Sequence, residues 1–238
     1  MRFPSVRFPL SALLLFTACV DGAVGQTRLA EKGELILAED FRRHAVYTKD
    51  RLPLAEGWVV RVAHGLWERT PEGVRSTWEK GHSPVLVLEG AFEDVVVELD
   101  FRYEEEEGKW AACRVSATNP ELYPRAYAAS VWANVNFKSR GRGFLIENDE
   151  WGGHITRVSY KKADFAPGTW HTLRFTLVGN KGQAECNGIQ VTGTHEKFGM
   201  PKTSLWLATG QSPHELRTLR IYRAAQADAD APKAEGKS

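Results

Sequence analysis

The 238-residue chain has almost no net charge, because 31 Lys and Arg side chains are opposed by 30 Asp and Glu side chains, which gives a formal charge of +1. A chain this close to neutral has no broad attraction for phosphates, so we expect it not to bind nucleic acid. Disorder over the whole chain is also excluded, since that requires low hydrophobicity or strong net charge and 42% of the residues are apolar. The composition indicates a globular protein and fits an uncharged ligand.

Cysteine is scarce, with Cys19 near the N-terminus and Cys113 and Cys186 further along. A single pair is too few for a small disulfide-stapled scaffold, and no Cys and His spacing resembles a metal site. The sequence therefore favours two small buried thiols over a disulfide. It predicts no metal and no other cofactor.

Apolar runs of membrane length are missing too, since a spanning helix needs about 20 residues. The run at 10–18 is shorter, follows Arg2 and Arg7, and is typical of a secretory signal. Two kinds of processing stay open: 16–19 resembles a lipobox in which Cys19 would be lipidated, and 23–26 suits ordinary cleavage. We expect an exported protein that is periplasmic, extracellular or held at the cell envelope by a lipid on Cys19.

The two ends of the chain differ from the middle. The last stretch, 224–238, is small, polar and without apolar periodicity, which predicts a disordered tail. With a leader over 1–26, one domain remains at 27–223. Its 29 basic and 29 acidic residues cancel once Arg2, Arg7 and Asp21 are removed with the leader. The sequence does not indicate an oligomeric state.

The dominant period of the middle region is two. Between Asp94 and Tyr103 every odd position is apolar, and 170–178 and 131–137 alternate in the same way, which predicts half-buried strands. Further strands are predicted at 34–41, 58–62, 66–69, 73–76, 85–88, 110–117, 143–147, 155–160, 204–208 and 216–222. No segment has a sustained helical period.

Turn residues support this pattern. Asn187-Gly188 predicts a tight hairpin, because both central positions of a type I′ turn need positive φ. In that register Cys186 lies opposite Ile189 and Ala184 opposite Val191. Many short strands with one apolar face each must cover one another, so we predict an all-β fold of two antiparallel sheets packed as a jelly-roll sandwich.

Four segments together resemble a known family. They are 92–102, the strand entry 163–174 with its Pro-Gly-x-Trp-His-x-Leu pattern, Asn187-Gly188, and 216–221. In this combination the chain resembles the 3-keto-disaccharide hydrolase domain over about Leu35 to Tyr222, a concanavalin A-like jelly roll related to laminin-G-like domains and family 16 glycoside hydrolases. The resemblance implies a carbohydrate-active protein that acts on a glycosidic bond as a hydrolase or lyase. Its Arg-bearing strand corresponds here to Arg114.

Family 16 glycosidases carry catalytic carboxylates on a strand of the form E-x-D-x-x-E. The nearest match is 147–152, where Glu147 and Asp149 could share a face and His154 follows as a candidate base or ligand. These three are the candidate catalytic residues. Because two glycines follow, we predict that this stretch forms an acidic turn between strands ending at Glu147 and starting at Ile155. A sugar or cation contact and a catalytic pair are the alternatives.

A second candidate surface is the polar face of the strand at 131–137. Trp132, Asn134 and Asn136 share that face, with Arg114 and Trp110 placed near it. Amide and guanidinium groups pair with sugar hydroxyls, and the C–H face of a sugar stacks on Trp. These five are the candidate substrate-binding residues, and an ordinary solvent-facing strand is the alternative.

Two charged runs need separate interpretation. The four glutamates at 104–107 indicate a solvated loop, and the short basic loop at 138–143 could contact an anionic glycan. His171 belongs to the strand-entry pattern and is expected to be structural.

Three functions remain open. The first is an enzyme acting on glycosidic bonds, which requires a titratable group with a shifted pKa in the cleft. The second is a glycan-binding module, for which Trp132 and Asn134 would be exposed on the concave sheet with no acid nearby. The third is an envelope scaffold protein, anchored through Cys19 or not. The expected partner in the first two cases is an oligosaccharide or glycan.

Overall fold

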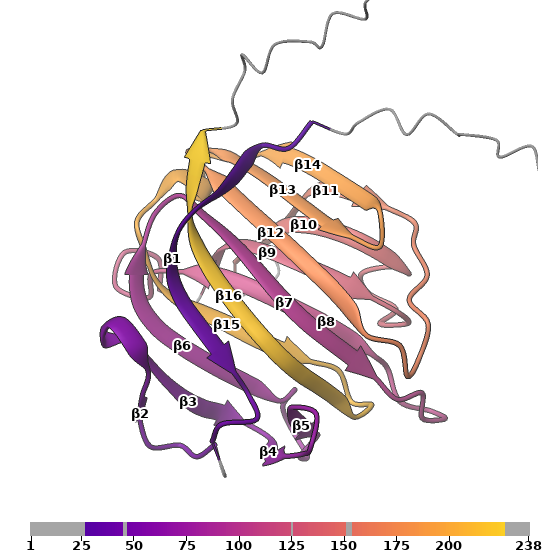
Figure 1. Ribbon diagram of the computed structural model, residues 1–238. Coiled ribbons are helices and arrows are strands. Elements are labelled where there is room, and N and C mark those ends of the chain that lie inside the picture. The colour runs from indigo at the N-terminus through magenta and orange to yellow at the C-terminus, as the bar shows by residue number, and fades with distance from the viewer. Residues whose placement is uncertain (1–26, 45–46, 125, 151–153, 227–238) are drawn as a thin grey trace, which may run out of the picture.

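The computed structural model describes residues 27–44, 47–124, 126–150 and 154–226. Over these ranges the regular secondary structure is all strand apart from two short 3-10 helices, η1 (Ala55–Gly57) and η2 (Glu196–Gly199). None of the described helical segments is long and apolar enough to cross a membrane. The strands form two layers, seen one in front of the other in Figure 1.

Sheet A has the order β14-β13-β12-β7-β16-β5-β4, and β1 also pairs with β16. Its strands are β1 (Ala30–Asp40), β4 (Leu66–Arg69), β5 (Val74–Thr77), β7 (Val95–Tyr103), β12 (His171–Val178), β13 (Lys181–Cys186), β14 (Ile189–Thr194) and β16 (His214–Gln226). The strand pairs of this sheet are antiparallel. The long central strands of this sheet come from distant parts of the sequence.

Sheet B has the order β11-β10-β9-β8-β15-β6-β3-β2. Its strands are β2 (Leu52–Pro53), β3 (Val59–His64), β6 (Val85–Phe92), β8 (Ala112–Thr118), β9 (Ala126–Asn134), β10 (Gly143–Glu150), β11 (His154–Lys161) and β15 (Lys202–Thr209). These pairings are antiparallel as well. The predicted jelly-roll sandwich of two antiparallel sheets is confirmed.

The core lies between the sheets and follows the two-residue period. Sheet A contributes alternate residues such as Val97 and Leu99, and sheet B contributes Val115 and Val131, all in one buried cluster. Burying this apolar area contributes most of the stability, at roughly 25 cal/mol per Å². The faces turned away from the core are then free to carry polar side chains.

The predicted hairpin is present, with Asn187 and Gly188 both at positive φ and the expected pairs Cys186 with Ile189 and Ala184 with Val191. Cys113 and Cys186 are buried free thiols, as expected. The predicted start of the tail at 224 is wrong, because β16 continues to Gln226 by pairing with β1. The leader, Cys19 and the rest of the tail lie outside the described residues.

Candidate functional site

One face of sheet B is turned away from the core, and we call it the open face. On β8 and β9 the core-facing residues include Val115, Val131 and Ala133, so the intervening side chains point outward. The open face carries Arg114, Ser116, Ser130, Trp132, Leu145, Glu147, Asp149, Ser204, Trp206, Val87, Glu89 and Arg61, placed by the strand registers.

Four of these side chains and one from the loop between β9 and β10 form what we call the ionic cluster: Arg114, Trp132, Glu147, Asp149 and, from the loop, Arg140. Oε1 of the fully buried Glu147 accepts hydrogen bonds from Trp132 Nε1 at 2.6 Å and Arg140 Nε at 3.1 Å. Asp149 Oδ2 lies 3.5 Å from Arg140 Nη2 and 3.6 Å from Arg114 Nη1. One arginine therefore bridges the two carboxylates of β10.

Trp132 is the apolar centre of the ionic cluster. The Cζ atoms of Arg114 and Arg140 lie 4.8 and 5.2 Å from its ring, within the range of cation–π attraction. Phe137 stacks on it at 6.0 Å and on Trp110 at 4.4 Å. These aromatic rings and Arg114 line a pocket of about 130 Å³, which we call the aromatic pocket.

The polar atoms of the ionic cluster are incompletely satisfied. Arg114 Nε is buried without a hydrogen-bond partner in the described part of the chain. Glu147 Oε2 is 3.1 Å from Arg140 Nε but makes no aligned hydrogen bond. Burial raises the pKa of Glu147, although Arg140 and Trp132 oppose the shift. Buried polar groups normally have partners, so these atoms are notable in a native fold.

The structure brings together four of the predicted site residues: Arg114, Trp132, Glu147 and Asp149. Trp110 joins them through Phe137 at the aromatic pocket. The expected acidic turn is wrong, because β10 continues through Glu150 and pairs with both β9 and β11. Its cross-strand bonds on both sides keep these acidic residues extended.

The side chains of the two predicted asparagines form hydrogen bonds with the backbone of the protein itself. Asn134 is fully buried, and its side-chain Nδ2 donates to the carbonyl oxygens of Phe137 and Gly141. Asn136 follows the end of β9, where its Oδ1 accepts from Ala111 N and its Nδ2 donates to Lys109 O. The expectation that Trp132 and Asn134 would be exposed without a nearby acid is therefore wrong, since Trp132 is 6% exposed and bonded to Glu147.

The histidines take different places. His154 is exposed at the start of β11, where it pairs with Glu150 rather than with the ionic cluster. His171 is buried, with Nε2 3.0 Å from Ala166 O and Nδ1 2.8 Å from Asn187 Nδ2, which fits the structural role expected of it.

Sequence reasoning did not place Arg140, Tyr127 or Trp206 on this face. Arg140 lies in the short basic loop at 138–143, and the positive charge of that loop was the signal that could have pointed to it. The register of β9 against β10 shifts between Glu147 and Asp149. As a result, the ring centroid of Tyr127 lies 4.5 Å from Arg114 Cζ and 5.5 Å from the ring centroid of Trp206. A strict two-residue alternation cannot reveal such a shift.

The fold and the open face define a jelly-roll domain with an aromatic and ionic surface on one sheet. The chain belongs to the 3-keto-alpha-glucoside-1,2-lyase-like domain family, whose model matches residues 49–222. This agrees with the resemblance read from the sequence. The search of curated proteins found no match.

Three solved structures share the fold. A galectin-like protein of unknown function from Bacillus subtilis has a TM-score of 0.60 at 10% identity, covering 83% of this chain and 100% of its own. SCLam, a non-specific endo-beta-1,3(4)-glucanase from family GH16, has a TM-score of 0.58 at 12% identity, covering 83% and 93%. The carbohydrate-binding module CBM66 from Bacillus subtilis has a TM-score of 0.52 at 11% identity, covering 70% and 93%.

Proposed function

We propose that the open face binds a carbohydrate and that the ionic cluster cleaves a glycosidic bond next to a 3-keto group. The observation that carries this proposal is the pair of carboxylates on β10, Glu147 and Asp149, bridged by Arg140 beside an aromatic pocket. Membership of the 3-keto-alpha-glucoside-1,2-lyase-like family supports that choice of substrate.

A 3-keto group acidifies the neighbouring C2–H bond, so a single well-placed base can begin the reaction. Asp149 is the base in this proposal, because its side chain is 13% exposed whereas Glu147 is fully buried. The C2 proton moves to Asp149, a C1=C2 double bond forms, and the C1–O bond breaks. Its electron pair leaves with the departing oxygen, which takes a proton from water.

The charge that develops on the keto oxygen needs a cation close by. Arg114 supplies it, because its guanidinium lies on the open face between Trp132 and Asp149. Preorganised donors of this kind stabilise developing charge strongly in a site that excludes water. Glu147 is a positioning residue, since it holds Trp132 and Arg140 by hydrogen bonds.

The test is cleavage of a 3-keto glucoside by the wild type and by Asp149→Asn. We expect the variant to lose activity about 100-fold or more, in the range typical of a removed general base, while its folding is unchanged. Asp164→Asn is a matched control, because Asp164 is a 70% exposed partner of Arg142 outside the open face. Equal activity of all three proteins would refute the assignment of Asp149.

Binding without cleavage is the second candidate. Hydrolysis by general acid and base uses two carboxyl groups that both reach the substrate. Here Glu147 is fully buried and Asp149 is the more accessible of the pair, which favours binding alone. The structural likeness to CBM66, named as a carbohydrate-binding module, fits this alternative. A wild type that binds the 3-keto glucoside without forming product would select it.

We also propose export, supported by the apolar run at 10–18 after Arg2 and Arg7. Mass spectrometry of the mature N-terminus distinguishes the two kinds of processing. A lipid-modified Cys19 would establish an anchor, and a free N-terminus near Thr27 would establish ordinary cleavage. An unprocessed Met1 in the purified native protein would contradict export by this route.

A further inference from the structure

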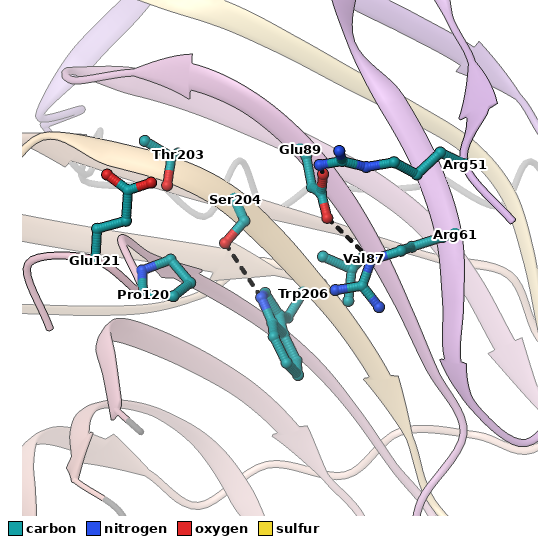
Figure 2. Close-up of a pocket in the computed structure, with 9 residues that line it drawn as sticks. All are labelled: Arg51, Arg61, Val87, Glu89, Pro120, Glu121, Thr203, Ser204 and Trp206. Atoms are coloured by element: carbon teal, nitrogen blue, oxygen red, sulfur yellow. Dashed lines mark hydrogen bonds and ion pairs between the residues drawn. The ribbon is translucent and has the colours of Figure 1, made fainter. Parts of the chain in front are cut away.

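A second pocket of about 290 Å³ lies on the open face, between β3, β6, β15 and the loop after β8. Figure 2 shows Trp206 and Ser204 in its middle, with Pro120 and Glu121 on one side and Glu89 with two arginines on the other. We call it the Trp206 pocket. Its volume is just below the range of about 300–1,000 Å³ for small-molecule sites, which suits a single ring.

The lining of the Trp206 pocket is chemically mixed and balanced in charge. Arg51 and Arg61 are opposed by Glu89 and Glu121, and the half-buried Trp206 offers an aromatic surface. A strongly anionic ligand would meet the two carboxylates, and a cation would meet the two guanidiniums. A neutral ring with many hydroxyls can use both kinds of polar group while it stacks on the indole.

The side chains of this pocket are held in place before any ligand binds. Glu89 pairs with Arg51 and accepts a 2.9 Å hydrogen bond from Arg61 Nε. Trp206 Nε1 donates to Ser204 Oγ at 3.2 Å. Fixed side chains lower the entropy cost of binding, so the pocket is preorganised.

The Trp206 pocket and the ionic cluster lie along one line across sheet B. Glu147, Ser130, Ser116 and Trp206 are successive cross-strand partners, and the line continues through Val87 to Arg61. The two serines between the sites are small, buried and bonded to each other at 2.8 Å. Because both serines are fully buried, the surface between the two sites is made by the side chains around them, among them Tyr127, whose ring centroid lies 5.5 Å from that of Trp206.

The length of this line sets the size of the ligand. From β10 to β15 there are three strand spacings, or about 14 Å at about 4.8 Å each. A pyranose with its bridging oxygen extends about 5 Å, given single bonds of about 1.5 Å. One or two units therefore cannot reach from Asp149 to Trp206, but about three can.

We propose that the Trp206 pocket is a subsite for a neutral sugar ring about two units away from the ionic cluster, so the open face recognises oligosaccharides of three or more units. This inference rests on the proposed function, because it places both sites on one ligand. It adds a length requirement that cleavage at the ionic cluster alone does not impose.

The test is calorimetric titration with α- and β-linked glucose oligosaccharides of one to four units. These probes lack a 3-keto group, so the proposed elimination cannot consume them. We expect affinity in one linkage series to rise about tenfold between two and three units. Trp206→Ala should remove that gain and leave the affinity of the shorter ligands unchanged.

Two control variants distinguish the loss of a ligand contact in the Trp206 pocket from a general loss of folding. Glu89→Gln keeps the shape of the pocket and should reduce the same gain, whereas Trp170→Ala, on the outer face of sheet A, should leave it unchanged. Affinity independent of length, a gain that survives Trp206→Ala and Glu89→Gln, or no binding of any probe would overturn the inference. Cleavage of a 3-keto glucoside that depends on Asp149 would still stand in each of those cases.

Discussion

The outer faces of the two sheets carry similar residues but bond their carboxylates differently. Each has a tryptophan between two arginines: Trp132 with Arg114 and Arg140 on sheet B, and Trp170 on sheet A, where the Cζ atoms of Arg102 and Arg217 lie 4.8 and 4.5 Å from the ring. Composition alone would rank the two faces equally as ligand sites.

Their carboxylates distinguish them. On sheet A, Asp100 accepts hydrogen bonds from Thr172 and Thr218 at 2.7 Å and from Arg217 at 3.2 Å. Burial alone would raise the pKa of Asp100, but these bonds outweigh it and hold the pKa below the usual value. On sheet B the arginine contacts of Asp149 are 3.5 and 3.6 Å long, and burial raises the pKa of Glu147.

This difference shows how a structural ion pair can be told apart from a binding site in a protein of this fold. Asp100 has donors that satisfy its charge within the chain. The ionic cluster instead leaves Asp149 with two long arginine contacts of 3.5 and 3.6 Å, which a ligand can complete.

The largest expected effect is on the tryptophans. Trp132→Ala removes a side chain that is 6% exposed and should destabilise the protein by about 3–5 kcal/mol, typical of a buried aromatic residue. Trp170 is half-buried, so Trp170→Ala should cost less than half as much. Urea unfolding of both variants measures the two losses. Equal losses would contradict the view that Trp132 is the more deeply packed of the pair.

The next effect concerns His214 on sheet A, whose Nε2 also lacks a partner among the described residues. Burial lowers its pKa from 6.5 to about 4, so the unfolded state binds more protons between those values. Stability should therefore rise by about 3 kcal/mol as the pH increases from 4 to 6.5, at about 1.4 kcal/mol per pKa unit.

Unfolding of His214→Gln over the same pH range measures this contribution. The variant should have a flatter stability profile, and sugar binding at pH 7 should be unchanged because His214 is enclosed by the core. An identical slope in both proteins would show that other groups titrate there. A flatter profile in the variant would sharpen the comparison, because His214 Nε2 would then be a buried atom, unpartnered among the described residues, that affects stability and not ligand binding.

A smaller effect is expected from Asp100→Asn. Loss of the charge weakens the bonds from Arg217 and the two threonines, at a cost of about 1–3 kcal/mol. Carbohydrate binding on the opposite sheet should not change. Thermal unfolding and calorimetry on the same sample measure both quantities, and a loss of affinity without a loss of stability would reverse the roles we give the two faces.

Much of the fold was predictable because its signals are local. The alternation from Val95 to Tyr103 and the Asn187-Gly188 turn each determine burial or register within one strand or hairpin. The extension of β10 through Glu150 was not predictable in this way, because pairing with β9 and β11 overrides the turn tendency of the glycines that follow.

The candidate site was likewise predictable only in part. Arg114, Glu147 and Asp149 were named through the resemblance to known carbohydrate-active families, and Trp132 from its place on a polar strand face. The sheet brings all four together. Arg140 reaches the ionic cluster from a loop, and Trp206 comes from β15, far along the chain. Neither position follows from a two-residue alternation, since that of Arg140 depends on the conformation of the loop between β9 and β10 and that of Trp206 on which distant strands pair.

The most direct test of the central claim is a crystal structure of Asp149→Asn with a bound 3-keto disaccharide. The account predicts the sugar on the open face, with an oxygen within hydrogen-bond distance of the Arg114 guanidinium and a ring at the aromatic pocket. A sugar bound at Trp170 on sheet A, or an open face left without sugar at a saturating concentration, would contradict it.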